Sequence, residues 1–251
     1  MLLPPVTIVM TLFIPPIDGP YGGWARFQSA RQTVLSWGRH MKYSGQLQLY
    51  IANDSVAIHE AMANQMGEDF SPWPVAVGHT QGAGLGGALN HGLQWAFDRS
   101  PLAIYADDSY SLVEDVDLTP WASVLMRQEE RRDEDAPWPL GAVSLMPPRP
   151  EQVRGRVVYY QDIRTEGVAG VIFERQGYNW NGRPLMYHKR FFDAYGWTPE
   201  GVTGYEWERV YAEHFVETPG PDVLYAFIDP WQHVWSVLLG NAPAGWSGEK
   251  P

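Results

Sequence analysis

Apolar and polar positions along the chain form blocks that predict alternating strands and helices. Residues 6–13 form a continuous apolar and β-branched run, of a length that suits a strand buried on both faces of a parallel sheet. Residues 24–41 carry apolar side chains at helical spacing. The same alternation continues with strands at 47–52, 75–77 and 101–106 and with helices around 58–62 and 89–97. This order predicts βαβ units.

The second half of the chain is less regular. Thr119 followed by Pro120 is typical of a helix start, and several prolines between 137 and 150 mark irregular segments. We expect strands at 142–146, 157–160 and 168–173, and helices at 186–195 and 205–215. The pattern predicts an α/β protein with a mainly parallel central sheet flanked by helices and a smaller, irregular α+β half.

Length and composition narrow the class of protein. The chain has 251 residues, near the upper limit of one hydrophobic core, so we expect a single domain. Hydrophobic residues make up 45% and charged residues 19%, as in packed globular proteins. The absence of cysteine excludes disulfides, thiolate catalysis, iron–sulfur clusters and cysteine-type zinc sites.

The charge and hydropathy of the chain limit its partners. A net charge of -11 argues against non-specific binding to nucleic acid or to an anionic membrane. A local basic patch from Arg183, Lys189 and Arg190 leaves duplex DNA open. Apolar runs stay shorter than the ~18 residues of a membrane span. The N-terminal residues lack the basic flank of a signal peptide, so we expect a cytoplasmic protein.

Candidate chemistry gathers where the predicted strands end. Ligands of parallel sheets bind at the carboxyl ends of the strands. Three such segments lie at those ends: Asn53-Asp54, the glycine-rich turn 82–87 and Asp107-Asp108. Asp107-Asp108 would suit Mg²⁺ or Mn²⁺, because a cation relieves the repulsion of adjacent carboxylates. Taken singly, each motif also has an ordinary structural explanation. Asp107-Asp108 fits a solvated turn or a helix cap, residues 53–55 fit a cap of the helix at 58–62, and residues 82–87 fit a tight turn.

Taken in order, the motifs resemble those of a GT-A glycosyltransferase, particularly of the family 2 type. Ala88-Leu89-Asn90 matches the end of the family's Asn-x-Gly-x-x-x-Ala-x-Asn segment, and Gln81 stands where Asn is common. Ala106-Asp107-Asp108 is similar to the Asp-x-Asp metal motif, with Ala106 in place of the first Asp. Other similar segments, between about residues 5 and 216, are 6–13, 31–37, 49–55, 186–197 and 204–208.

The resemblance implies a Rossmann-like fold and a nucleotide-diphosphate sugar as donor, UDP being one such nucleotide. Asp108 and Asp107, joined by His233, would hold Mn²⁺ or Mg²⁺ on the diphosphate. Glu206 would be the general base on an acceptor hydroxyl, giving inversion, and Glu208 the second candidate. The donor side would consist of Asp54, Asn53, Gln81, Gly84, Asn90 and Asp107.

The resemblance also divides the chain. Residues 5–118 would form the half that binds the nucleotide sugar, residues 119–240 the acceptor-binding half, and residues 241–251 a flexible tail. Trp180, Trp197 and Trp207 are candidates for stacking on an acceptor or for core packing. The acceptor is open: a glycan, a lipid-linked sugar, a protein side chain, a small molecule or a modified nucleobase.

Two other functions compete. A sugar-nucleotide nucleotidyltransferase needs a basic, glycine-rich loop after the first strand, but the loop 14–23 contains no basic residue before Arg26. A non-catalytic binding protein of the same fold is the other alternative, and the presence of Asp54, Asp108 and Glu206 together argues against it. A retaining mechanism also stays open, since one glutamate does not determine stereochemistry without geometry.

Overall fold

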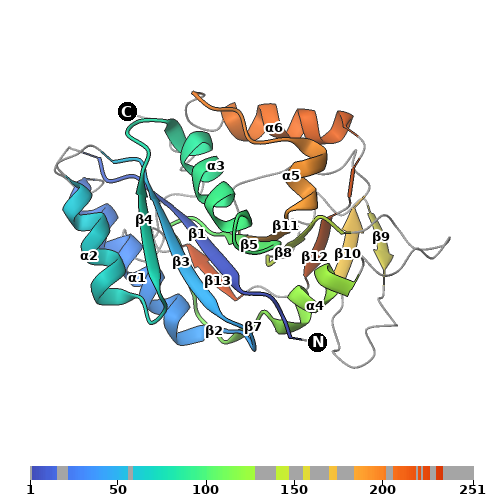
Figure 1. Cartoon of the computed structure of the whole chain (residues 1–251), viewed down its shortest axis with the longest axis horizontal. Helices are drawn as coiled ribbons and strands as arrows, with labels where there is room; N and C mark the ends of the chain where they lie inside the picture. Colours follow the sequence, from blue (N-terminus) through green and yellow to red (C-terminus); the bar gives the residue numbers. More distant parts are fainter. Residues whose placement is uncertain are drawn as a thin grey trace.

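The computed structural model describes residues 2–15, 22–55, 59–127, 140–146, 155–158, 170–173, 184–201, 206–218, 220–221, 223–226 and 230–233. Within this part of the chain, nine strands form one sheet in the order β4-β3-β1-β5-β11-β8-β12-β10-β9 (Figure 1). Its first four strands are parallel: β4 (Val75–His79), β3 (Leu47–Asn53), β1 (Val6–Leu12) and β5 (Leu102–Tyr105). The predicted parallel sheet is therefore confirmed for the first half.

The second half continues the same sheet with mixed strand directions. Here β11 (Leu185–His188) runs antiparallel to both β5 and β8 (Ala142–Ser144). Beyond them, β12 (Val223–Ala226) is parallel to β8, and β10 (Gly170–Phe173) is antiparallel to both β12 and β9 (Gly155–Val158). Two small sheets lie apart, namely β2 (Met41–Lys42) with β7 (Val116–Asp117) and β6 (Tyr110–Leu112) with β13 (Trp231–His233).

Helices cover both faces of the sheet. One face carries α1 (Gly23–His40), α2 (Glu60–Phe70) and α4 (Thr119–Arg127), which share a core with Ile8 and Met10 of β1. The other face carries α3 (Gly84–Phe97), α5 (Arg190–Tyr195) and α6 (Glu206–Glu217), which share a core with Val9 (Figure 1). Successive side chains of a strand point to opposite faces, so all of β1 is buried, as its apolar sequence predicts.

Two sequence predictions about elements are wrong. Residues 186–195 are not one helix, because Leu185–His188 is a buried strand between β5 and β8, and only Arg190–Tyr195 is helical. A short apolar run fits either structure, and packing in the sheet decided it. Nor do residues 53–55 cap α2, whose N-cap is His59 without a side-chain cap. The proposed tail at 241–251 lies outside the described residues.

Among the helices that the structure describes, none has both the length and the apolar character needed to cross a bilayer.

Candidate functional site

The carboxyl ends of three parallel strands lie side by side. In the sheet, Leu12 of β1 pairs with Asn53 of β3, and Val9 pairs with Tyr105 at the end of β5. The backbone N–H of Asp54 donates to the carbonyl of Leu12 at 2.8 Å. Asp54 and the Asp107-Asp108 pair therefore leave the sheet at the same edge, on either side of β1, as the sequence predicted.

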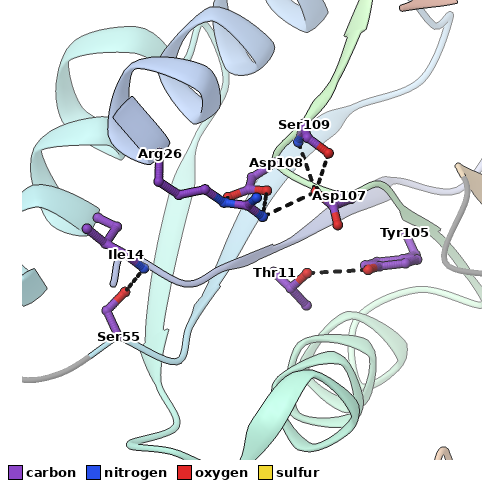
Figure 2. A network of polar contacts seen from close by, with 8 residues as sticks. All are labelled: Thr11, Ile14, Arg26, Ser55, Tyr105, Asp107, Asp108 and Ser109. Carbon is purple, nitrogen blue, oxygen red and sulfur yellow. Dashed lines mark hydrogen bonds and ion pairs between the residues drawn. The ribbon is translucent and has the colours of Figure 1, made fainter. Parts of the chain in front are cut away.

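The carboxylate of Asp108 is fully buried and bound to an arginine. Arg26, in the first turn of α1, donates from Nε to Oδ2 of Asp108 at 2.7 Å, and its Nη2 donates to Oδ1 (Figure 2). Such a two-point contact between guanidinium and carboxylate is among the strong hydrogen-bonding arrangements in proteins. Sequence reasoning missed this residue. Its only signal was its place as the first basic side chain after the first strand.

Asp107 is the more open carboxylate of the pair. Its side chain is 24% exposed, whereas that of Asp108 is 0% exposed. Oδ1 of Asp107 accepts from the backbone N–H and the hydroxyl of Ser109, at 2.9 and 2.8 Å, and lies 3.6 Å from Nη2 of Arg26 (Figure 2). Asp107 therefore faces the site, and Asp108 supports it from inside.

The two carboxyl groups differ in their electrostatics. Burial raises the pKa of Asp108 well above its ordinary value, and the charge of Asp107 adds to this effect while Arg26 opposes it. Burial acts in the same direction on Asp107. Its pKa is nevertheless held below the ordinary value by hydrogen bonding with Asp108, by the charge of Arg26 and by Ser109. Negative charge is thus concentrated on the side chain that reaches the surface.

The carboxylate pair fits a hard divalent cation whose other ligands come from water and from a phosphate. Mg²⁺ and similar ions are usually held by one or two carboxylates together with water and phosphate oxygens. Among the described residues, here or elsewhere, no cluster of three or more His, Cys, Asp or Glu side chains could hold a metal ion, so an ion at this pair would need further ligands. His233, on β13, pairs with Tyr110 on β6 just after the Asp107-Asp108 turn, so its backbone lies beside the site. Its side chain lies outside the described part.

Asp54 is held by the chain itself. Its Oδ1 accepts from Thr80 Oγ1 at 2.7 Å and from the backbone N–H groups of Gly82 and Ala83, both at 2.8 Å. Its Oδ2 accepts from the N–H of Gly84 at 3.0 Å. The carboxylate fills the concave array of amides at the start of α3, the kind of array that binds anions. Contact between Asp54 and a nucleoside stays a prediction.

The backbone conformation of residues 81–84 makes the hydrogen bonds to Asp54 possible. Gln81, Gly82 and Gly84 have positive φ angles of 51°, 85° and 76°, which glycine adopts without strain and other residues rarely adopt. These angles turn the amides of residues 82–84 toward Asp54. A role for Gln81 and Gly84 in donor binding also stays a prediction.

Asn53 and Ser55 join the strand ends. Asn53, buried at the end of β3, accepts from the N–H of Ser55 at 3.2 Å and contacts Nδ1 of His79 at 3.0 Å. Ser55 in turn accepts from the N–H of Ile14 at 2.8 Å (Figure 2). These contacts replace the helix cap that the sequence suggested for residues 53–55, because the side chains turn back to the sheet edge.

Asn90 connects α3 to the segment 196–201. Its buried amide donates to the carbonyl of Thr198 at 2.8 Å and to Oε1 of Glu200 at 3.0 Å, and it accepts from the N–H of Thr198 at 3.0 Å. A side chain at Gly86 would place its Cβ 2.3 Å from the carbonyl oxygen of Pro199. The glycine thus permits the close approach that Asn90 stabilises.

The segment 196–201 returns along α3 toward the site. Trp197 lies 6.4 Å from Phe97, measured between ring centroids, at the last residue of α3, whereas Pro199 contacts Gly86 near its start. The segment therefore leads to the edge where the strands end, shortly before α6 begins at Glu206. The backbones of Glu206 and Glu208 belong to the start of α6, and their side chains lie outside the described part.

Trp197 lies away from the carboxylates. Its ring is stacked on Phe192, with centroids 5.0 Å apart and an interplanar angle of 17°, near the end of α3 that is opposite to Asp54. The 14 residues of α3 span roughly 20 Å. Trp197 is nevertheless 39% exposed, so its stacking on an acceptor stays a prediction. Trp180 and the side chain of Trp207 lie outside the described residues.

Comparisons with known proteins agree with this architecture. Neither the family models nor the curated proteins gave a match. Among solved structures, S. aureus TarS 1–349 matches 88% of this chain with a TM-score of 0.52 and 12% identity. Its complex with UDP-GlcNAc matches 92% with a TM-score of 0.51 and 12% identity. GalNAc-T7 with UDP, GalNAc and Mn²⁺ matches 89% with a TM-score of 0.53 and 15% identity.

These neighbours are GT-A fold glycosyltransferases, and the chain has the GT-A fold that the sequence predicted. It spans 60% of the length of both TarS chains and 42% of that of GalNAc-T7. Identities of this size show the shared fold alone.

Proposed function

We propose that this protein transfers a sugar from a nucleotide-diphosphate sugar to an acceptor hydroxyl. The observation that carries this proposal is the partly exposed Asp107 beside Asp108 at the carboxyl end of β5, within a GT-A fold. The structural neighbours that were solved with UDP-GlcNAc or with UDP and Mn²⁺ support a donor of this class.

We propose that Asp107 and Asp108, with His233, hold Mn²⁺ or Mg²⁺. When bound, such an ion would supply positive charge to stabilise the leaving nucleotide diphosphate. Asp107 is partly exposed and so accessible to such an ion, and the buried Asp108 is the next residue of the same turn. Asp54, Asn53, Gln81 and Gly84 would form the nucleoside side of this edge.

On the acceptor side, we propose Glu206 as the general base, with inversion at the anomeric carbon, and Glu208 as the second candidate. The path of residues 196–201 toward the carboxylate edge supports this assignment. Asn90 would contribute by holding that path. In this proposal residues 5–118 bind the donor and residues 119–240 the acceptor, a glycan, a protein, a small molecule or a modified nucleobase. The cytoplasmic location stays a prediction.

One observation favours a non-catalytic nucleotide-sugar-binding protein as the second candidate. Both oxygens of Asp108, the residue expected to hold the metal, are bound by Arg26. A protein that only binds a nucleotide sugar could retain this ion pair permanently. A nucleotidyltransferase has less support, since the loop 14–23 lacks the basic residues of that class.

A thermal-shift screen of nucleotide diphosphates and nucleotide sugars, with and without Mn²⁺, tests the proposal. A ligand that binds only the folded protein raises its melting temperature. We expect a nucleotide diphosphate to stabilise the protein in a manner that requires Mn²⁺ and is lost in Asp107→Asn. Asp98→Asn, an exposed carboxylate at the far end of α3, is the matched control and should respond like the unchanged protein.

The screen is followed by donor turnover with a panel of hydroxyl acceptors. Turnover that is lost in Glu206→Gln while nucleotide binding persists would support transfer. Binding without turnover on any acceptor, or even hydrolysis of the donor, would favour the binding protein. A panel in which no nucleotide diphosphate stabilises the protein would exclude both.

A further inference from the structure

Arg26 occupies the position at which a metal would meet Asp108. Asp108 has no exposed surface, and both of its oxygens face the guanidinium of Arg26. The same Nη2 lies 3.6 Å from Oδ1 of Asp107, so the guanidinium lies beside both carboxylates (Figure 2). A cation approaching from outside meets Asp107 first and reaches Asp108 only where Arg26 now lies.

Arg26 balances part of the local negative charge before any metal binds. The guanidinium compensates one of the two adjacent carboxylates, and the remaining negative charge lies at Asp107. A divalent ion held by Asp107 alone has a single protein carboxylate and lies near a positive side chain, so its binding is weak. An ion held by both carboxylates must replace the arginine.

The backbone of Arg26 is fixed, whereas its side chain has room to exchange partners. The start of α1 packs against the end of β1, since a Cβ at Gly23 would lie 2.7 Å from the carbonyl oxygen of Pro15. Phe27 and Ala30 anchor the same helix in the core. The side chain of Arg26 is 24% exposed, and its flexible methylene stem can carry the guanidinium from a carboxylate to a phosphate.

We propose that Arg26 is the resident counter-cation of the Asp107-Asp108 pair and sets its affinity for metal ions. A divalent ion binds Asp108 only by displacing the guanidinium, which then turns to the diphosphate that arrives with the ion. This inference rests on the proposed function for the identity of the diphosphate, but not for the competition between arginine and metal. Arg26 acts as a positioning and specificity-determining residue.

The test is a calorimetric titration of Mn²⁺ into the full chain without nucleotide. The unchanged protein should bind Mn²⁺ weakly. Arg26→Gln, which removes the competing charge, should bind it at least ~10-fold more tightly. Arg26→Lys keeps the positive charge but loses the two-point contact with Asp108, and its Mn²⁺ affinity should stay near that of the unchanged protein. Arg39→Gln changes the net charge equally on the exposed last turn of α1 and should have no effect.

Equal Mn²⁺ affinities of Arg26→Gln and the unchanged protein would overturn the inference, as would the absence of Mn²⁺ binding in both. Arg26→Gln leaves a buried carboxylate without its partner, so its melting temperature is measured with and without Mn²⁺. We expect Mn²⁺ to raise it more than it raises that of the unchanged protein. If this variant folds only with Mn²⁺, that requirement itself supports the competition. If the ion does not stabilise the variant, the inference is wrong.

A second titration with UDP at saturating Mn²⁺ separates this inference from the proposed function. Arg26→Gln should weaken UDP binding, because the released guanidinium no longer meets the diphosphate. If UDP binds neither protein while Mn²⁺ affinity rises in Arg26→Gln, the donor assignment fails and the role of Arg26 stands. If UDP binds with Mn²⁺ while the Mn²⁺ affinity of Arg26→Gln is unchanged, the role of Arg26 fails and the function stands.

Discussion

Two acidic turns follow parallel strands at the same edge of the sheet, and they are satisfied in opposite ways. After β3, the carboxylate of Asp54 accepts four hydrogen bonds from neutral donors, three of them backbone amides. After β5, the carboxylate of Asp108 is paired with the charged side chain of Arg26, and Asp107 remains partly exposed. Similar sequence positions thus support different chemistry.

The difference lies in what each partner can do without unfolding. Amides of a turn are fixed by the backbone, so Asp54 cannot exchange them for a ligand unless the turn itself rearranges. A guanidinium on a flexible stem can move while its helix stays packed. We therefore regard the turn at Asp54 as part of the scaffold and the pair at Asp107-Asp108 as the exchangeable part of the site.

The largest expected effect tests the exchangeable part. Asp108→Asn keeps the shape of the side chain but removes the charge for which a metal and Arg26 compete. We expect the rate of sugar transfer to fall roughly 10²–10³-fold, the scale of losing one group that stabilises charge in a transition state. Transfer is measured with UDP-sugars and Mn²⁺, with Asp98→Asn as control. Full activity of Asp108→Asn in the presence of a chelator would contradict a metal role for this carboxylate.

The next effect tests the scaffold part. Asp54→Ala removes the acceptor of four hydrogen bonds and leaves the amides of residues 82–84 unpaired at the start of α3. A hydrogen bond to a charged group contributes about 1.5–3 kcal/mol, and water will replace some of these bonds because residues 82–84 are exposed or partly buried, so we expect a loss of about 3 kcal/mol in the free energy of unfolding. Urea denaturation measures it.

Asp54→Asn sharpens the same comparison. It retains one acceptor oxygen and should recover part of the stability lost in Asp54→Ala. If Asp54→Asn instead kept full stability and lost nucleotide affinity, Asp54 would belong to the exchangeable part, and its predicted contact with the nucleoside would gain support.

The strands of the first half could be predicted from the sequence because their residue patterns fit a strand and no other element. The run at 6–13 is apolar or β-branched throughout, and each following strand is separated from the next by a helix with clear periodicity. Residues 185–188 escaped prediction because a short, mostly apolar run directly before a true helix looks like the first turn of that helix. Only pairing with β5 and β8 shows that it is a strand.

The acidic residues of the candidate site could be predicted from the sequence, whereas the groups that bind them could not. Strand ends place Asp54 and Asp107-Asp108 at one edge, and this follows from parallel topology. Arg26 and Asp108 are 82 positions apart, and nothing in the local sequence pairs them. The glycines at 82 and 84 indicate positive φ angles, but the direction of their amides depends on where Asp54 ends the neighbouring strand.

The smallest effect concerns the connection between α3 and the acceptor side. Gly86→Ala would place a Cβ 2.3 Å from the carbonyl oxygen of Pro199, so the segment 196–201 must move. Overpacking of this kind costs about 1–3 kcal/mol, and we expect about 2 kcal/mol in the free energy of unfolding. Gly82→Ala is an informative partner, since its Cβ meets no atom within 4 Å and only its positive φ opposes the change.

The two variants report on different parts of the edge. If residues 196–201 position Glu206, Gly86→Ala should lower the rate of transfer while UDP affinity in the presence of Mn²⁺ stays within about twofold, since Asp107, Asp108 and Arg26 are untouched. Gly82→Ala loosens the turn around Asp54 and should affect stability more than transfer. Equal losses of transfer and UDP affinity in Gly86→Ala would instead tie the segment 196–201 to the donor, and the boundary between scaffold and exchangeable site would have to include it.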